Sequence, residues 1–138
     1  MDTLTKEHRS WVMSRIRGRD TAIEVRLRSA LHRLGFRFRK NVRGLPGTPD
    51  IVLPKYRTVV FVHGCFWHRH PNCKRATMPK SRVAFWRKKF ERNSVNDRQH
   101  LRDLRKAGWR VVTVWECQIL KNLDTVAERI RKRLSERV

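Results

Sequence analysis

The stretch DIVLPKYRTVVFVHGCFWHRHPNC, residues 50–73, decides the fold. Its first half holds two segments rich in β-branched and apolar residues, 50–53 and 58–63, which are separated by a short turn at residues 54–57. Two such segments joined by so short a turn predict an antiparallel β-hairpin. Its second half has no periodicity and is rich in cysteine and histidine, so we expect a long loop that leaves the hairpin.

The register of this hairpin follows from the centre of its turn. A turn centred on Tyr56 sets Leu53 opposite Val59 and Asp50 opposite Val62. The Asp50 carboxylate would then lie beside the far end of the second strand, where the loop begins.

A helix and a strand are predicted before the hairpin. The segment Thr21-Ala-Ile-Glu24 matches a capping box, and apolar residues follow at helical spacing until Gly35, which is typical of a helix end. Residues 36–40 alternate aromatic and basic side chains, as a half-buried strand does.

Three more elements are predicted after the loop. Residues 81–107 predict a helix with a break, ending at Gly108, and residues 110–115 predict a buried strand. A final amphipathic helix is marked by Leu123, Val126, Ile130 and Leu134. The fold class is therefore α/β, a mixed central sheet flanked by helices. We expect a basic arm at residues 1–19 and one domain over residues 20–138.

The charge of the chain indicates its class of partner. The 138 residues include 34 Lys and Arg against 12 Asp and Glu, a net charge of +22. These cations are interleaved with apolar residues, so they predict a folded domain with a basic surface that binds nucleic acid. The longest apolar run, residues 59–62, is too short to span a membrane. We expect a monomer with no membrane association.

The three cysteines favour a metal site over disulfides. An odd number of cysteines close to several histidines fits a reducing compartment and a metal. Three thiols and one imidazole complete a tetrahedral zinc site that would clamp the loop to the end of the last strand; the expected ligands are Cys65, His70, Cys73 and Cys117. His68 is an alternative to His70, and ordinary buried thiols are an alternative to the whole site.

Asp50 is the candidate ligand of a second, catalytic cation. Phosphodiester hydrolysis needs a divalent cation to neutralise the scissile phosphate, and hard cations prefer carboxylate and carbonyl oxygens. The Asp50 side chain and the backbone carbonyl of Val62 would supply both kinds of oxygen. The alternative is an aspartate that only caps a turn at the start of a strand.

His63 and His68 are the candidate bases, since neither is needed for the zinc site. A neutral imidazole can accept a proton from water near neutral pH, and an adjacent carboxylate, for which Asp97 is the candidate, would orient it. A surface or zinc-supporting role is the alternative. Glu24 could touch a water on the cation or could serve only the capping box.

Aromatic residues in the polar loop suggest contact with bases. Proteins that distort duplex DNA insert apolar wedges between base steps, at a cost that a mismatched step lowers. Phe66 and Trp67 are candidate wedges, with packing against the zinc site as the alternative, and Trp86 belongs to the same question. We expect Trp109 and Trp115 in the core.

Four segments together resemble the very-short-patch repair (Vsr) endonuclease family: RDTAIE at residues 19–24, LPGTPD at 45–50, HGCFWHRHPNC at 63–73 and GWRVVTVWEC at 108–117. The resemblance implies a fold similar to type II restriction endonucleases. It also implies Mg²⁺-dependent nicking of duplex DNA 5′ to the thymine of a T·G mismatch left by deamination of 5-methylcytosine. It further implies a cytoplasmic, nucleoid-associated location in a bacterium, with mismatch-repair proteins as further candidate partners.

The resemblance also implies a role for each candidate residue. Asp50 and the carbonyl of Val62, where the family has a threonine, would bind Mg²⁺. His68 would be the general base paired with Asp97, and His63 and Glu24 would assist. The structural Zn²⁺ would be held by Cys65, His70, Cys73 and Cys117. The DNA would be contacted by Phe66, Trp67 and Trp86 and, from the arm, by Met13 and Ile16.

Two rival interpretations also account for the predicted basic surface. One is a restriction-like nuclease without mismatch preference, and the other is a non-catalytic, zinc-stabilised DNA-binding module. Salt-sensitive DNA affinity is expected of all three, because each releases counterions. Nicking of matched and mismatched duplexes, and the effect of Asp50→Ala, would separate them.

Overall fold

The computed structural model describes residues 21–136. Its elements in chain order are α2 (Ala22–Arg33), β1 (Arg39–Lys40), β2 (Ile51–Leu53), the 3-10 turn η1 (Pro54–Tyr56), β3 (Thr58–His63), α3 (Val83–Lys106), β4 (Arg110–Trp115), α4 (Glu116–Lys121) and α5 (Leu123–Ser135). The expected arm at residues 1–19, with Met13 and Ile16, lies outside the described residues. Among the helices described, none is long and apolar enough to cross a membrane.

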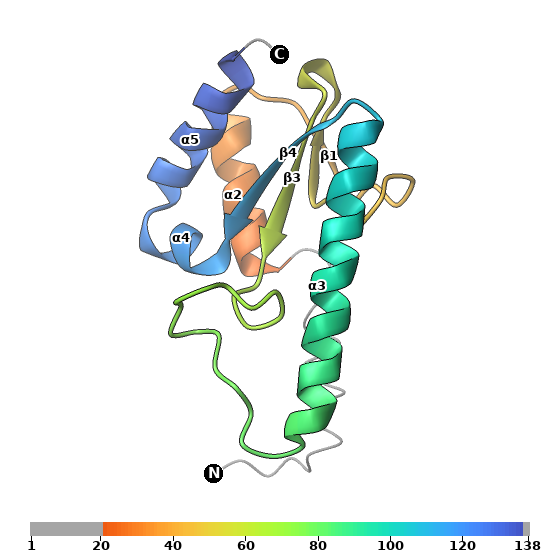
Figure 1. Cartoon of the computed structure of the whole chain (residues 1–138). Coiled ribbons are helices and arrows are strands. Elements are labelled where there is room, and N and C mark those ends of the chain that lie inside the picture. Colours follow the sequence, from red (N-terminus) through yellow and green to blue (C-terminus); the bar gives the residue numbers. More distant parts are fainter. Residues whose placement is uncertain (1–20, 137–138) are drawn as a thin grey trace.

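The four strands form one mixed sheet in the order β1-β2-β3-β4. β2 pairs antiparallel with both β1 and β3, whereas β3 and β4 run parallel. A parallel pair needs a long crossover, which is supplied here by the loop at residues 64–82, called the 64–82 loop, and by α3. The carboxyl ends of β3 and β4 therefore meet at one end of the sheet, next to the 64–82 loop (Figure 1).

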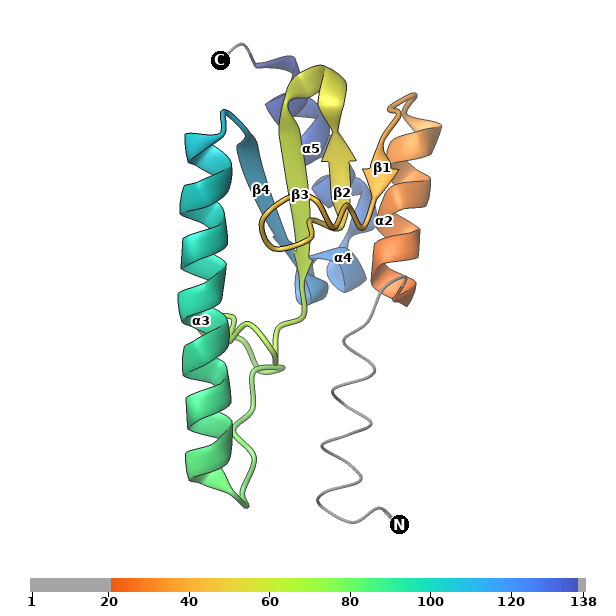
Figure 2. The same ribbon diagram turned by 90° about the vertical axis from the view of Figure 1, so that its right-hand side faces the viewer.

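The two faces of the sheet are covered by different helices, as Figures 1 and 2 show. Strand residues alternate between the faces. Ile51 and Val60 belong to the main hydrophobic core, which α2, α4 and α5 complete. Their neighbours Val52 and Val59 belong to a smaller core with Leu104 of α3. The predicted α/β class, with a mixed sheet flanked by helices, is confirmed.

The hairpin forms, but the predicted register is wrong by one residue. Leu53 pairs with Thr58 and not with Val59. The turn consists of η1 followed by Arg57 in the left-handed conformation (φ 49°). All four residues 54–57 therefore belong to the connection between the strands and none of them pairs. The centre of the turn lies before Tyr56 rather than on it.

α2 forms as predicted, but its capping box does not. Thr21 precedes the helix, and its hydroxyl is buried without a hydrogen-bond partner among the described residues. Glu24 lies 3.6 Å from the guanidinium of Arg28, one turn further along the same helix. The helix ends ahead of Gly35, whose φ of 95° fits the predicted helix end.

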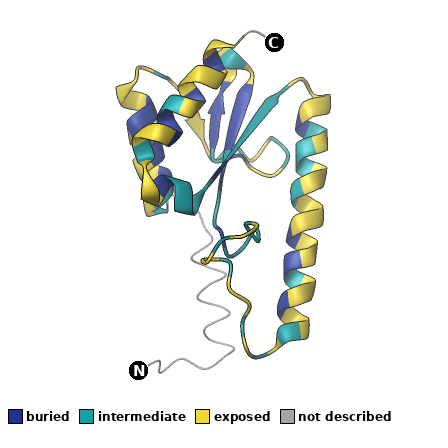
Figure 3. Cartoon of the chain, turned by 60° about the vertical axis from the view of Figure 1, so that its left-hand side comes forward, coloured by how far each residue is buried: buried dark blue, intermediate teal, exposed yellow. Residues whose placement is uncertain are grey.

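Four differences in length and exposure correct the sequence predictions. β1 is shorter than residues 36–40, and β4 is mostly half-buried rather than buried. α3 runs unbroken for 24 residues, without the predicted break. Much of α3 is exposed (Figure 3), so its sequence needs no continuous apolar stripe. α4 was not predicted, because six residues directly after a strand are too few to show helical periodicity.

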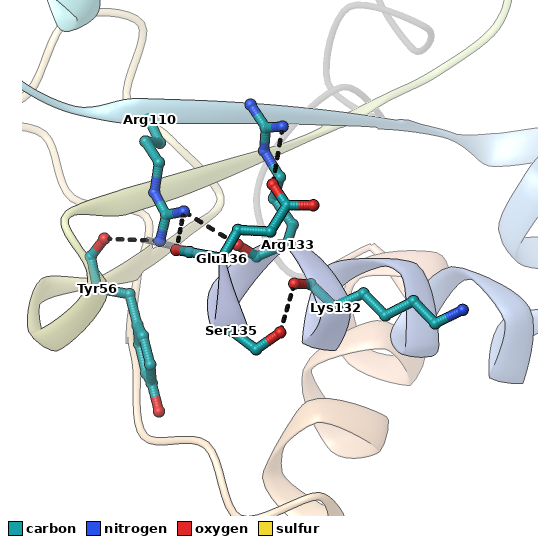
Figure 4. A network of polar contacts seen from close by, with 6 residues as sticks. All are labelled: Tyr56, Arg110, Lys132, Arg133, Ser135 and Glu136. Carbon is teal, nitrogen blue, oxygen red and sulfur yellow. Dashed lines mark hydrogen bonds and ion pairs between the residues drawn. The ribbon is translucent and has the colours of Figure 1, made fainter. Parts of the chain in front are cut away.

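Arg110, at the start of β4, ties the end of α5 to the hairpin turn. Its guanidinium donates hydrogen bonds to the carbonyls of Arg133 at 3.0 Å and Glu136 at 2.9 Å, and to that of Tyr56 at 3.3 Å (Figure 4). The last carbonyls of a helix have no partner within the helix. Arg110 satisfies two of them and so fixes the end of α5 against the sheet.

Candidate active site

The predicted catalytic residues meet around one cavity at the carboxyl ends of β3 and β4. The cavity has a volume of about 910 Å³. Its lining includes Glu24, Asp50, Val62, His63, Phe66, Trp67, His68 and Asp97. These residues come from α2, the hairpin, the 64–82 loop and α3, so the fold brings together residues that are far apart in the sequence.

Strand alternation explains why this cavity faces α3. His63 is the last residue of β3, and its partner in the parallel register is Trp115, the last residue of β4. Both follow the alternation of Val59 and Val111, which belong to the core on the α3 side. The 64–82 loop then turns back, with the His68 N–H bonded to the Gly64 carbonyl at 3.1 Å. This turn brings His68 back beside His63.

Asp50 directly precedes β2, and its carboxyl group is largely buried. Its Oδ2 atom accepts a hydrogen bond of 2.6 Å from the backbone N–H of Val62. Burial raises the pKa of Asp50 from 3.8 to about 7, with a further rise from nearby Glu24, while the Val62 N–H acts in the opposite direction. A carboxylate is costly in such a place unless a cation accompanies it. The donor chemistry therefore fits a hard divalent cation.

The second group of titratable side chains consists of His63, His68 and Asp97. Nδ1 of His68 lies 2.6 Å from Oδ2 of Asp97. The rings of His63 and His68 are stacked, with centroids 3.8 Å apart and planes 5° apart. Ligand atoms of all three residues lie within 4.8 Å of one another, as a metal site would require. However, imidazole lone pairs lie in the ring planes, so two parallel rings do not aim them at one point, and the arrangement suits proton transfer better.

The third group contains the four expected zinc ligands, Cys65, His70, Cys73 and Cys117. One ligand atom from each lies within 4.8 Å of the others. Nδ1 of His70 is 3.7 Å from the Cys65 sulfur and 3.4 Å from the Cys117 sulfur. Burial raises the pKa of the Cys65 thiol, so in the absence of a cation this sulfur stays protonated. Three sulfurs and one imidazole nitrogen are compatible with zinc, and His68 belongs to the other group.

Arg69 organises the 64–82 loop, a role that no pattern in the sequence indicates. Its guanidinium donates hydrogen bonds of 2.9 Å to the carbonyls of Ala76 and Thr77, and one of 3.4 Å to that of Phe66. It also lies 4.3 Å from the centre of the Phe90 ring of α3. Arg69 thus joins both ends of residues 66–77 to the helix that supplies Asp97.

The aromatic residues of the 64–82 loop pack on α3. The Phe66 ring contacts those of Trp67, Trp86 and Phe90, with centroids 5.2 to 5.7 Å apart. Trp86 is only 7% exposed and does not line the cavity, whereas Phe66 and Trp67 are half-buried and do. The cation of Lys89 lies 5.1 Å from the Trp67 ring. The cavity therefore has an aromatic wall with a cation beside it.

Trp115 is not the core residue that its strand suggested. It is half-buried, lines the cavity and stacks on His70, with centroids 4.2 Å apart and planes 12° apart. Trp109 packs on the smaller core under the guanidinium of Arg57. Periodicity gives the side of a strand on which a residue lies, but it does not show that a cavity lies there.

Gly47 and His100 form another contact at the cavity that the sequence did not indicate. Gly47 has a φ of 77°, and a Cβ added to it would lie 2.9 Å from Nδ1 of His100. Both residues line the cavity. The turn that leads into Asp50 is therefore seated directly against α3.

Comparisons with known proteins agree with this chemistry. A family model described as DNA mismatch endonuclease Vsr matches residues 1–75. The DNA mismatch endonuclease Vsr of Escherichia coli K12 is 43% identical over 135 residues, which cover 98% of this chain and 86% of that protein.

Two nicking enzymes are also similar over nearly their whole length. The type II nicking enzyme V.XorIIP of Xanthomonas oryzae is 45% identical over 94% of this chain and 94% of its own. The type II nicking enzyme V.NmeAIP of Neisseria meningitidis is 44% identical over 98% of this chain and 95% of its own. Each alignment extends from the hairpin through the Cys and His residues to β4, since each covers more than nine-tenths of this chain.

Proposed function

The chain belongs to the family of the DNA mismatch endonuclease Vsr, and from this premise we propose that it nicks duplex DNA 5′ to the thymine of a T·G mismatch, with Mg²⁺ as its catalytic ion. The chain is a DNA mismatch endonuclease. The reaction is hydrolysis of a phosphodiester bond in one strand. A thymine opposite guanine is what deamination of 5-methylcytosine leaves, so nicking beside it would begin very short patch repair.

The observation that carries the proposal is the meeting of Asp50 with the His68–Asp97 pair at one cavity. A cation-binding carboxylate and an oriented base are the two things that metal-assisted hydrolysis needs. Asp50 and the Val62 carbonyl would hold Mg²⁺, which supplies charge neutralisation at the scissile phosphate. Because a carbonyl of the main chain is used, a valine at this position can serve as well as the threonine of the family.

His68 acts as the general base in this proposal. Its Nδ1 is engaged by Asp97, which leaves Nε2 to accept a proton from the attacking water. Asp97 holds the ring in the required tautomer and stabilises the positive charge that develops on it. His63, stacked on His68, and Glu24, close to Asp50, would assist around the phosphate and its waters.

The preference for a mismatch would come from the aromatic wall. Unstacking a base step costs a few kcal/mol, and a mismatched step costs less. Phe66 and Trp67 line the cavity and would enter the DNA, and Trp86 would support them from α3. The arm around Met13 and Ile16, outside the described residues, would contact the other groove.

The Cys and His group would hold a structural zinc ion. Its four side chains leave no open position for substrate, which is the pattern of structural rather than catalytic zinc sites. We further propose a restriction-endonuclease-like fold, a monomer, a place at the bacterial nucleoid and double-stranded DNA as the principal partner. Mismatch-repair proteins are additional candidate partners.

The test is a nicking assay on two duplexes that differ in one base pair. One duplex carries a T·G mismatch, the other the matched T·A pair, and each is incubated with and without Mg²⁺. We expect a nick 5′ to the mismatched thymine only with Mg²⁺, and its loss in Asp50→Asn with DNA binding retained. Equal rates on the two duplexes would refute the mismatch preference, and nicking by Asp50→Asn at the wild-type rate would refute the site.

A further inference from the structure

Trp115 stands between the zinc-ligand group and the candidate base. One neighbour is His70, on which its indole stacks at 4.2 Å. Another is His63, at 5.3 Å and with the ring planes 76° apart. His63 in turn stacks on His68 at 3.8 Å. Four rings are thus in continuous contact, from a zinc-ligand residue to the residue that Asp97 orients.

We propose that Trp115 is a positioning residue for nicking: it holds His63, and through His63 the ring plane of His68, against the zinc-braced end of the 64–82 loop. This inference rests on the proposed function, because it takes His68 as the base. It adds a role for a residue that touches neither of the proposed metal ions nor the reacting phosphate.

The hydrogen bond to Asp97 is not enough to fix the His68 ring. It fixes the direction of Nδ1, but the ring can still turn about the line that joins Nδ1 to Oδ2. The stacked ring of His63 removes this freedom. His63 must itself be held, and Trp115 packs against it from the neighbouring strand. Phe61 also contacts the His63 ring, with centroids 5.7 Å apart, so removal of the indole takes away one of the rings that support His63 and loosens the stack of the two imidazoles.

Backbone contacts on both sides of Trp115 hold this residue in place. Trp115 and His63 are partners in the register of the parallel strands β3 and β4. The Trp115 N–H donates to Oε1 of Gln118 at 3.1 Å, which closes the first turn of α4. Two residues further on, the Cys117 N–H lies 3.4 Å from the Cys65 sulfur. The end of β4, the start of α4 and the cysteine group therefore form one unit with the indole at its centre.

Three variants test the proposal. Trp115→Leu removes the flat ring, and Trp115→Phe keeps one. Trp109→Leu is the matched control, since it removes a half-buried indole from the other end of the same strand region, outside the cavity lining. Each zinc-loaded protein is assayed for zinc content, for affinity to the T·G duplex and for single-turnover nicking at saturating enzyme.

We expect Trp115→Leu to keep its zinc and its DNA affinity but to nick about 100-fold more slowly, the loss that a ~1 Å misplacement of a reacting group causes. Trp115→Phe should restore most of the rate, and Trp109→Leu should nick like the wild type. A Trp115→Leu protein that nicks at the wild-type rate, or one that loses its zinc, would overturn the proposal.

A spectroscopic measurement tests the role of Trp115 independently of whether the protein nicks DNA. Long-range ¹H–¹⁵N spectra report the tautomer and surroundings of each imidazole, with signals assigned through His63→Gln and His68→Gln. We expect the His63 and His68 signals to move in Trp115→Leu and to stay in place in Trp109→Leu. Unchanged signals would overturn the role of Trp115 whatever the enzyme cuts, whereas a wild-type protein that does not nick would overturn only the function.

Discussion

His68 and Asp97 are 29 positions apart in the sequence, yet Nδ1 of the one lies 2.6 Å from Oδ2 of the other. His68 comes from the 64–82 loop and Asp97 from the middle of α3. The contact therefore joins the 64–82 loop to the helix that covers the opposite side of the cavity. It also decides which nitrogen of His68 is available for chemistry.

Asp97→Asn should separate orientation of the base from binding of DNA. An amide can present its NH₂ group to Nδ1 and so favour the wrong tautomer of His68. We expect single-turnover nicking to fall by about 10²- to 10⁴-fold, with unchanged affinity for the duplex. Asp103→Asn, on the same helix and bonded to Gln99, is the control. Equal activity of both variants would show that Asp97 does not orient the base.

Asp50 should make the stability of the protein depend on pH when Mg²⁺ is absent. The pKa of this carboxyl group is about 7 in the folded protein, against an ordinary value of 3.8. Its neutral form therefore contributes stability in full below pH 3.8, and this contribution is lost as the pH rises through about 7.

Asp50→Asn removes the charge and leaves an oxygen that can accept the Val62 N–H. We expect its advantage in the free energy of unfolding over the wild type to grow by roughly 2–3 kcal/mol between pH 5 and pH 8, at about 1.4 kcal/mol per unit of pKa shift. Urea denaturation at the two pH values, with zinc retained, measures this. An advantage that shrinks as the pH rises would contradict the burial of Asp50.

Gly47→Ala should disturb the turn that leads into Asp50. The residue has a φ of 77°, and an added Cβ would lie 2.9 Å from the His100 ring. We expect a loss of about 1 kcal/mol or more in the free energy of unfolding, together with slower nicking. Gly44→Ala, whose Cβ would meet nothing within 4 Å, is the matched control and should behave like the wild type. A larger loss in the free energy of unfolding for Gly44→Ala than for Gly47→Ala would exclude this account of the turn.

Much of the fold is readable from local patterns in the sequence. The final helix follows from its period of about 3.6 residues, and the hairpin follows from two short apolar segments joined by a four-residue turn. The predicted register was wrong by one residue because the true register depends on the left-handed conformation of Arg57. The sequence carries only a weak signal for this conformation when the residue is not glycine. The break expected in α3 was wrong because the polar middle of that helix carries Asp97 and faces the cavity.

The candidate site also contains residues that could be predicted from the sequence and residues that could not. Asp50, the histidines and the cysteines could be predicted, because few residue types bind metals or move protons near neutral pH. Trp115, Arg69 and the contact of Gly47 with His100 could not be. Their importance lies in stacking, carbonyl contacts and close packing between segments distant in the sequence. Such contacts leave no local period.

Cys73→Ser should show how far the 64–82 loop depends on a metal. We expect loss of bound zinc and a fall of about 10 °C or more in Tm, since a structural zinc ion contributes several kcal/mol and each kcal/mol shifts Tm by a few degrees. Lys74→Ser, an exposed neighbour in the same loop, is the control. Metal analysis and calorimetry give the result, and a Cys73→Ser protein with wild-type Tm would argue against a structural metal here.

A double-mutant cycle on Asp50 and His68 tests most directly whether the two residues act on one phosphate. Single-turnover nicking of a T·G duplex in Mg²⁺ is measured for the wild type, Asp50→Asn, His68→Ala and the double variant. Groups that act as one unit are strongly non-additive, so the double variant should be about as slow as the slower single variant. Multiplication of the two single effects would show that the residues act independently and would contradict a shared catalytic site.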